Sequence, residues 1–193
     1  MILLLALLAT ILIGLARGGK LSRVGDIPLR WGWMPVIAFA MQSYLIFHAP
    51  VEKFGGISGV REVAFVLSYL LLLIAVWKNH QLPGVKIIGL GLLLNLAVMA
   101  ANGGLMPITP EALLRAGQEH LAPGLQSGIK VDDSKDIILS RDETRLWALS
   151  DIFVLSFPIR SVLSVGDILV AVGAFVLLQE AMLGRVKPKS PAD

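Results

Sequence analysis

The chain has 193 residues, of which 55% are hydrophobic and only 16% are charged, and it contains no cysteine. A soluble domain carries about 25% charged residues, so this composition favours an integral membrane protein. Without cysteine there is no disulfide framework, no thiol chemistry and no cysteine-based metal site. The net charge of +3 is explained by basic loops beside membrane spans, and no nucleic-acid-binding module is present, so no nucleic-acid partner is expected.

Five apolar segments follow one another along the chain. Each is roughly 15–17 residues long, somewhat short of the about 20 residues that span a bilayer, but apolar flanking residues can extend each of them. They are apolar on every side, which is typical of spanning helices and not of a soluble core. The first has no basic stretch before it and no A-x-A-like cleavage site, so we expect a retained helix and not a signal peptide. The segments are residues 1–16, 31–47, 63–77, 87–101 and 168–183.

The basic residues of the loops predict the orientation. With five spans, the loop after the first segment, the loop after the third segment and the tail fall on one side and hold nine Lys and Arg residues. The short loop at residues 47–62 falls on the other side, where two basic residues are balanced by two acidic ones. The positive-inside rule therefore predicts an outside N-terminus and a cytoplasmic C-terminus in the plasma membrane. Trp31, Trp33 and Trp77 suit an aromatic belt on the inner face.

The fourth apolar segment ends abruptly in a polar turn. Backbone groups cannot stay unpaired in lipid, so a helix that leaves the membrane has to close at the interface. Gly103 or Gly104 can adopt the left-handed conformation that closes a helix, and Asn102 can bond the freed carbonyl groups. Pro107 prevents the helix from continuing. The turn is predicted to send the chain sideways into an outer loop.

That outer loop covers about residues 102–164, which is too long for a plain connector, so we expect it to be structured and to pack on the outer face. A helix is predicted from Thr109 as N-cap, with Pro110 in its first turn, to a stop at residues 123–124. Residues 128–139 predict a small hairpin. Ser140 and Glu143 form a capping-box pattern that predicts a helix over residues 141–150. Residues 152–160 are expected to return apolar side chains toward the membrane.

Together these elements predict an all-α membrane protein, a five-span transmembrane helical bundle with a structured extracytoplasmic loop. Residues 1–183 are expected to form a single bundle domain, and residues 184–193 a disordered cytoplasmic tail. Asn95 and Gln42, in the middle of two spans, are expected to hydrogen-bond between helices. Gly89, Gly91 and Gly173 are expected to allow close helix contact. Basic tail residues are expected to pair with Glu180.

Several motifs in this order resemble a family of bacterial multi-pass membrane proteins that is classified only as a domain of unknown function. They are "GGKLSRV…PLRWGW" after the first segment, "NGGLMPI" after the fourth, "DETRLWALSDIFVLSFP" in the outer loop and "SVGDILVAVGAFVLLQ" at the start of the last. The resemblance covers nearly the whole chain and implies an integral membrane protein. It implies no established activity and supplies no catalytic residues.

Two acidic residues near the outer face are the weak catalytic candidates. Asp167 lies at the outer mouth of the last span, where it could act as a general acid or base or contact a ligand. Its spacing from Ser164 is also that of a capping box, which is the favoured interpretation. Asp151 follows the predicted helix of the outer loop, where an acidic residue is unfavourable unless it caps the next turn or is exposed to solvent.

Three functions remain open from these residues. The favoured one is non-enzymatic: the protein binds a membrane lipid, a small ligand or a partner protein at its outer face. The ligand-binding candidates are Asn102, Gly103, Gly104, Met106, Pro107, Asp151 and Asp167. The second is a membrane-embedded aspartyl hydrolase that uses Asp151 and Asp167. The acidic residue at the outer start of the last span is similar to one in lipoprotein signal peptidases. Their other catalytic Asp lies three residues after an Asn, but the residue three positions after Asn95 here is Val98. The third is a small carrier, disfavoured by the lack of a repeat.

No cofactor or metal is expected. The sequence has no phosphate-binding or dinucleotide-binding glycine motif and no nucleophile elbow. His48, His80 and His120 lack the spacing of metal ligands, although two of them could lie on the outer side near the acidic candidates.

Overall fold

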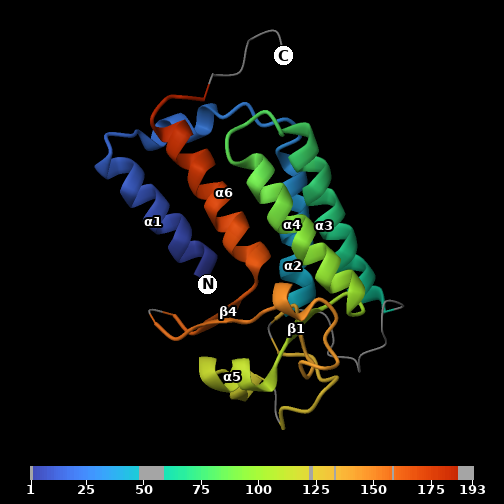
Figure 1. Ribbon diagram of the computed structural model, residues 1–193. Coiled ribbons are helices and arrows are strands. Elements are labelled where there is room, and N and C mark those ends of the chain that lie inside the picture. Colours follow the sequence, from blue (N-terminus) through green and yellow to red (C-terminus); the bar gives the residue numbers. More distant parts are fainter. Residues whose placement is uncertain (1, 48–58, 122–123, 133, 158, 187–193) are drawn as a thin grey trace.

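The computed structural model describes residues 2–47, 59–121, 124–132, 134–157 and 159–186. The predicted tail therefore lies mostly outside the described residues. The protein is mostly helical (Figure 1): five long apolar helices stand side by side, and a layer of short elements covers one end of them. We call this layer, residues 102–164, the cap.

All five apolar segments predicted from the sequence form helices, with slightly shifted bounds. Two of them, α3 and α6, are long and apolar enough to cross a membrane by length and composition, and the other three are shorter. Their apolar character on every side leaves many large side chains exposed, such as Phe39 at 70% and Val36 at 67%. The helices are α1 (Ile2–Ala16), α2 (Trp33–Phe47), α3 (Val60–Lys78), α4 (Val85–Ala101) and α6 (Val165–Met182).

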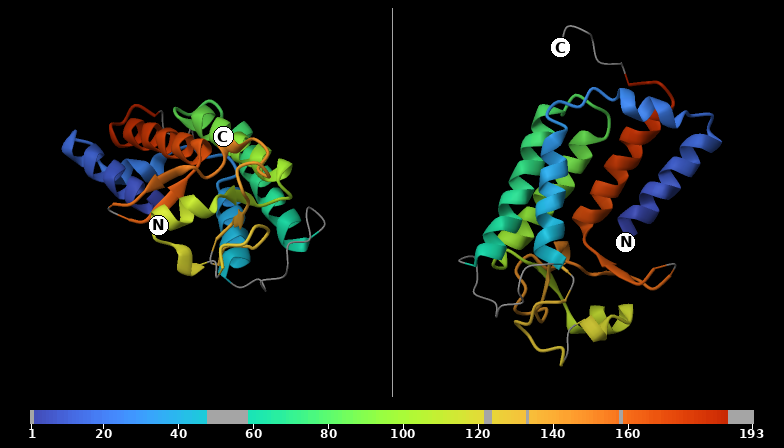
Figure 2. Two further views of the ribbon diagram at one scale, coloured as in Figure 1. Left: turned by 60° about the horizontal axis from the view of Figure 1, so that its bottom comes forward. Right: turned by 180° about the vertical axis from the view of Figure 1, so that it is seen from behind.

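Successive helices run in opposite directions, and α6 lies between α1 and α4, as the views from the cap and from behind show (Figure 2). The contact between α4 and α6 relies on glycine, as predicted. A Cβ atom on Gly91 would lie 2.5 Å from the carbonyl oxygen of Gly166, and one on Gly173 would lie 2.6 Å from that of Gly84. Gly89 similarly faces Val76 of α3. Small residues thus let the two helix backbones approach closely.

Polar side chains connect the helices at several depths. Gln42 of α2 donates a hydrogen bond to the hydroxyl oxygen of Ser68 of α3 at 2.9 Å, which confirms the predicted interhelical role. At the end of the bundle away from the cap, Arg17 donates to the Gln179 side chain at 2.8 Å. The predicted pairing of Glu180 with the tail is confirmed by its ion pair with Arg185 at 3.0 Å. A 3-10 helix, η1 (Leu21–Asp26), follows α1 at this end.

The cap contains two pairs of short strands. β1 and β2 pair in parallel, with Met106 opposite Asp136, and β3 and β4 form an antiparallel hairpin with Phe153 opposite Leu163. These strands correct the all-α expectation, since the cap is a mixture of strands, turns and short helices. The elements are β1 (Met106–Ile108), α5 (Pro110–Ala116), η3 (Glu119–Leu121), β2 (Asp136–Ile138), η4 (Trp147–Leu149), β3 (Phe153–Leu155) and β4 (Ser161–Leu163).

The predicted helix at Thr109 is present but shorter than expected. Thr109 is its N-cap and accepts a hydrogen bond from the backbone N–H of Ala112 at 3.2 Å. The helix ends at Gly117, which adopts φ +63° and donates its N–H to the Leu114 carbonyl oxygen. A left-handed glycine closes the helix here, so it does not continue to the Pro-Gly stop. Pro123 itself lies outside the described residues.

The α-helix predicted over residues 141–150 is wrong. The capping contacts do form, because the backbone N–H of Ser140 donates to the Glu143 carboxylate at 3.0 Å. However, Leu146 adopts φ +56°, and only the 3-10 turn of η4 follows. Asn102 bonds both the N–H and the carbonyl group of Arg145 at 2.8 Å. These bonds from another element hold the backbone away from the helical path.

The hairpin predicted over residues 128–139 is present in part. Its arms bond in antiparallel fashion from the Val131 N–H to the Asp136 carbonyl oxygen at 3.0 Å, and from the Ile138 N–H to the Ile129 carbonyl oxygen at 2.8 Å. Its second arm, β2, also pairs with β1, which the sequence did not predict. The β3–β4 hairpin was not predicted either.

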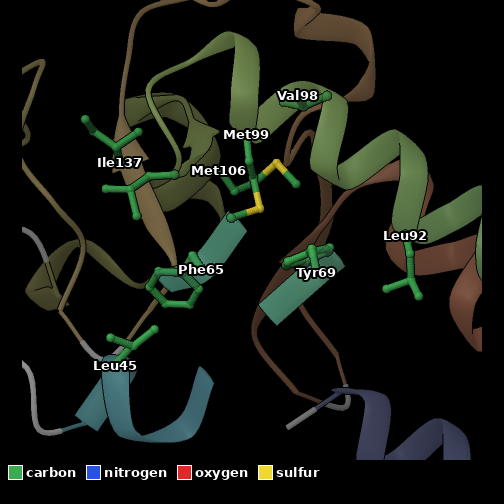
Figure 3. Close-up of a cluster of buried hydrophobic side chains, with 9 residues drawn as sticks. Leu45, Phe65, Tyr69, Leu92, Val98, Met99, Met106 and Ile137 are labelled. Carbon is green, nitrogen blue, oxygen red and sulfur yellow. The ribbon is translucent and has the colours of Figure 1, made fainter. Parts of the chain in front are cut away.

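One buried apolar cluster connects the bundle to the cap (Figure 3). Phe65 and Tyr69 come from α3, Val98 and Met99 from α4, and Ile137 from β2. These side chains are at most 6% exposed. The cap therefore packs against the helix ends as part of one apolar core.

Candidate functional site

The turn after α4 has the structure predicted for it. Gly103 and Gly104 adopt φ values of +84° and +97°, and the Gly104 N–H bonds the Met99 carbonyl oxygen at 2.7 Å. The Asn102 side chain bonds the freed Val98 carbonyl group at 2.7 Å. Because Asn102 also holds Arg145, the polar groups of this turn are used within the protein. A ligand-binding role for these three residues stays a prediction.

The strand that follows brings a distant acidic residue to the bundle. Met106 and Pro107 lie buried in β1, and the Pro107 carbonyl oxygen accepts a hydrogen bond from the backbone N–H of Asp151 at 3.2 Å. Asp151 also forms an isolated parallel bridge with Ile108. This pairing places Asp151 beside the end of α4, 2% exposed, although the sequence placed it after a helix or in solvent.

Asp167 has the capping role that its spacing predicted. Its backbone N–H donates to the Ser164 hydroxyl oxygen at 3.0 Å, and its carboxylate accepts from the Ser164 N–H at 3.3 Å. The other carboxylate oxygen accepts from the Asn95 side chain at 2.8 Å. Asn95 also accepts a hydrogen bond from the Ser164 hydroxyl at 2.8 Å. The predicted interhelical role of Asn95 is therefore confirmed, and it fixes the Asp167 carboxylate.

Lys135 brings the two acidic candidates together. Its Nζ atom lies 3.3 Å from the Asp151 carboxylate, 3.6 Å from that of Asp136 and 3.9 Å from that of Asp167. We call these four residues the Lys135 cluster. The sequence did not reveal Lys135 or Asp136, because their segment, "VDDSKDI", has the composition of a solvent-exposed turn. Only the β1–β2 pairing places them over the first turn of α6.

Two carboxyl groups of this cluster, those of Asp136 and Asp151, have a buried Oδ1 atom without a hydrogen-bond partner among the described residues, and Asp151 is the more deeply buried of the two. Its Oδ2 atom faces Lys135, but its Oδ1 atom is buried and accepts no hydrogen bond from any residue that the structure describes. Burial raises the pKa of Asp151 well above its usual range; Lys135 opposes this, while Asp136 and Asp167 reinforce it. The neutral acid form of Asp151 is thereby favoured.

Lys135 keeps its positive charge in this setting. Burial acts to lower the pKa of its ammonium group, but Asp151, Asp167 and Asp136 together raise that pKa well above its usual value. The side chain is still 23% exposed. The cluster thus combines one ammonium group, three carboxyl groups and two buried acceptors without a hydrogen bond from the described residues, an arrangement that can bind a cationic group or exchange a proton.

Another lysine of the cap, five residues earlier, is buried. The Nζ atom of Lys130 is 2.8 Å from the Glu62 carboxylate, and the two side chains are 5% and 2% exposed. Next to Glu62, Arg61 donates to the Ser134 carbonyl oxygen at 3.2 Å. These contacts join the first turn of α3 to the cap. In the sequence, Glu62 is only one of the charges of the 47–62 loop, and no local pattern indicates that Lys130 pairs with it.

The structure offers no metal site among the residues it describes. No group of three or more His, Asp or Glu side chains there is arranged to hold a metal ion. His80 contacts the Trp77 carbonyl oxygen at 2.7 Å, and His120 lies in η3, while His48 lies outside the described residues.

Comparisons with known proteins identify the family without an activity. No curated protein and no solved structure matches the chain. The family match begins at Asp26, so the "GGKLSRV" motif and α1 lie outside it. A family model described as "Family of unknown function (DUF5317)" matches residues 26–179, and the chain therefore belongs to that family.

Proposed function

We propose that the chain is a multi-pass membrane protein of the bacterial plasma membrane, with five spans, its N-terminus outside and its C-terminus in the cytoplasm. The length and apolar composition of α3 and α6 support this, as does the apolar surface of the three shorter helices. Among the described residues, the end with η1 carries seven Lys and Arg residues but only two carboxylates. The cap end carries seven Lys and Arg residues and nine carboxylates. That asymmetry is typical of a cytoplasmic end and an outer end.

The absence of cysteine makes this topology easy to test. Ser22 in η1 and Gln126 in the cap are both exposed and lie at opposite ends of the bundle. In intact cells, a membrane-impermeant maleimide should label Gln126→Cys, and should label Ser22→Cys only after the cells are permeabilised. The opposite labelling pattern would overturn the proposed orientation. Labelling of both residues in intact cells would mean that the helices do not separate two compartments.

At its outer face, the protein binds a small ligand that carries an ammonium group, with the Lys135 cluster as the binding site. The observation that carries this proposal is the buried Oδ1 atom of Asp151, which has no donor among the described residues. A buried acceptor without a donor costs about 1–3 kcal/mol, so a ligand that donates a hydrogen bond there is favoured.

The charges of the cluster support a cationic ligand. Three carboxyl groups share one ammonium group, and the distances of 3.3–3.9 Å exceed the about 2.7–2.9 Å of a close charged hydrogen bond. Lys135 is partly exposed, so its ammonium group can give way to that of a ligand. The ammonium group could belong to the ethanolamine headgroup of a membrane lipid or to a soluble amine.

Thermal unfolding in detergent tests this function. Ethanolamine should raise the melting temperature of the wild-type protein, because a ligand that binds only the folded state stabilises it. Asp151→Asn should abolish the rise, whereas Asp142→Asn, on an exposed carboxylate of the cap, should keep it. A rise with phosphatidylethanolamine but not with free ethanolamine would identify the lipid as the source. No rise with either, or an equal rise in Asp151→Asn, would contradict the proposal.

An aspartyl hydrolase is the second candidate, and one observation favours it. Asp151 and Asp167 lie around the same Lys135 ammonium group, and burial favours the protonated form of Asp151, as a general acid requires. The capping bonds of Asp167 to Ser164 count against a nucleophilic or basic role. Incubation with membrane extracts, followed by mass spectrometry, should then show hydrolysis products that are lost in both Asp151→Asn and Asp167→Asn. Identical product profiles for the wild type and the variants would reject this candidate.

A further inference from the structure

A second polar cluster lies at the end of the bundle opposite the cap, where α2 begins and α3 ends. Trp33 is the first residue of α2, and Trp31 lies in the turn before it; Trp77 and Lys78 lie in the last turn of α3. Arg30 precedes Trp31. All three indole rings are exposed, by 47%, 54% and 68% respectively. We call these five residues the aromatic–basic cluster.

A buried asparagine holds this cluster in place. The Asn79 side chain accepts a hydrogen bond from the Arg30 backbone N–H at 2.7 Å and donates one to the Arg30 carbonyl oxygen at 2.8 Å. It also donates to the Ala75 carbonyl oxygen at 2.7 Å. Asn79 thus fastens the segment before α2 to the end of α3, so the position of Arg30 is set by the fold.

The backbone next to this clamp adopts a conformation that is rare for a large side chain. Trp31 has φ +55°, in the left-handed region that favours glycine. In this conformation its ring lies 4.6 Å from the Lys78 Nζ atom, which is also 5.0 Å from the Trp77 ring. These are cation–π distances. The left-handed turn therefore brings two indole rings to one ammonium group on the surface.

The two cations of the cluster have no acidic partner in the described part of the chain. No ion pair joins the Arg30 or Lys78 side chain to a carboxylate there. Arg30 is exposed, and its side chain makes no hydrogen bond to another described residue. The surface thus presents uncompensated positive charge beside exposed indole rings.

From these observations we infer that the aromatic–basic cluster binds the phosphate headgroup of an anionic phospholipid. The inference rests on the membrane placement given under Proposed function, but not on the ligand of the Lys135 cluster. Tryptophan favours the level of the headgroups, and a nearby Lys or Arg is attracted to anionic lipid. Within two turns of Trp33, α2 exposes Val36 and Phe39, whose apolar side chains suit an acyl chain. This adjoining apolar face favours a lipid over a soluble anion.

Native mass spectrometry of the detergent-purified protein tests the inference. With an equal mixture of phosphatidylglycerol and phosphatidylcholine, the wild type should retain phosphatidylglycerol preferentially. Each charge removed in Arg30→Gln and Lys78→Gln should lower that preference about fivefold. Lys20→Gln is the matched control, because Lys20 is an exposed cation at the same end whose backbone bonds Met182 of α6 instead. It should keep the preference.

Each other outcome has a definite meaning. An unchanged preference in the Arg30→Gln/Lys78→Gln protein, or an equal loss in Lys20→Gln, would overturn the site. Displacement of the lipid by excess glycerol phosphate would show that the site binds a soluble anion and would contradict a lipid as its ligand. Recovery of the protein from the soluble fraction without detergent would instead contradict the membrane placement. Unchanged melting temperatures of the variants, expected because both side chains are surface groups, would exclude misfolding as the cause of a loss.

Discussion

The two lysines of the cap are only five residues apart, but their surroundings differ. Lys130 faces one carboxylate, that of Glu62, at 2.8 Å, and both side chains are almost completely buried. Lys135 is shared by three carboxylates at 3.3–3.9 Å and stays 23% exposed. The first arrangement is a one-to-one ion pair that fastens the cap to α3, although its buried Glu62 Oε1 atom accepts no hydrogen bond from the described residues. The second has three carboxyl groups for one ammonium group and is partly exposed, so it is the one with capacity to bind something else.

Replacing Lys130 by Met should cause the largest loss of stability. Glu62 would remain buried without its ion-pair partner, and breaking a buried pair on one side costs about 3–5 kcal/mol. Denaturant unfolding in detergent would measure the loss. Lys135→Met is the matched comparison and should cost clearly less stability. Lys135 is partly exposed, and the Asp151 carboxyl group favours its own neutral form, so it does not leave a full buried charge unpaired. Equal losses would remove the distinction between the two lysines.

Replacing Gly166 by Ala should cause the next largest loss. A Cβ atom there would overlap the Asn95 side chain and lie 2.5 Å from the Gly91 carbonyl oxygen. Overpacking of this kind costs about 1–3 kcal/mol, and it would displace the residue that holds Asp167. Gly25→Ala is the control, since no atom lies within 4 Å of a Cβ atom at that position. If the Gly166→Ala protein kept the unfolding free energy of the wild type, the α4–α6 contact would not be needed to support the Lys135 cluster.

Replacing Asp167 by Ala should lower stability by about 1 kcal/mol, the usual effect of losing a capping interaction. Asp167 bonds the Ser164 backbone N–H at the start of α6 and accepts from Asn95. The melting temperature of the purified variant is the measurement. An unchanged or higher melting temperature would mean that the charge destabilises the fold, and would strengthen a ligand role for Asp167.

The smallest effect is expected from Asp151→Asn, as a change in pH dependence. The pKa of Asp151 is raised in the folded state, so above its ordinary unfolded pKa of about 3.9 the folded protein holds more protons than the unfolded chain. Wild-type stability should therefore fall as the pH rises from about 4 toward the raised pKa, and the variant should lack this contribution. Melting temperatures between pH 4 and 8 test it. Parallel profiles would show that Asp151 is not perturbed.

Local patterns in the sequence were enough to predict several parts of the site. The Ser164–Asp167 box, the Thr109 cap and the glycine turn after α4 all depend on residues within a few positions of one another. The failed helix over residues 141–150 shows the limit. Its capping pattern was correct, but Asn102, about forty residues earlier, bonds the Arg145 backbone and replaces the helical hydrogen bonds.

The sequence therefore determined the five apolar helices, their caps and the charge difference between the two ends, because each follows from periodicity, composition or short spacing. Only the tertiary structure decided that Lys135 lies among Asp136, Asp151 and Asp167. This meeting depends on the parallel pairing of β1 with β2 and on the bridge from Ile108 to Asp151. Backbone pairing across such separations leaves no local pattern, and the segment "VDDSKDI" has the composition of a solvent-exposed turn whether or not its lysine lies in a cluster.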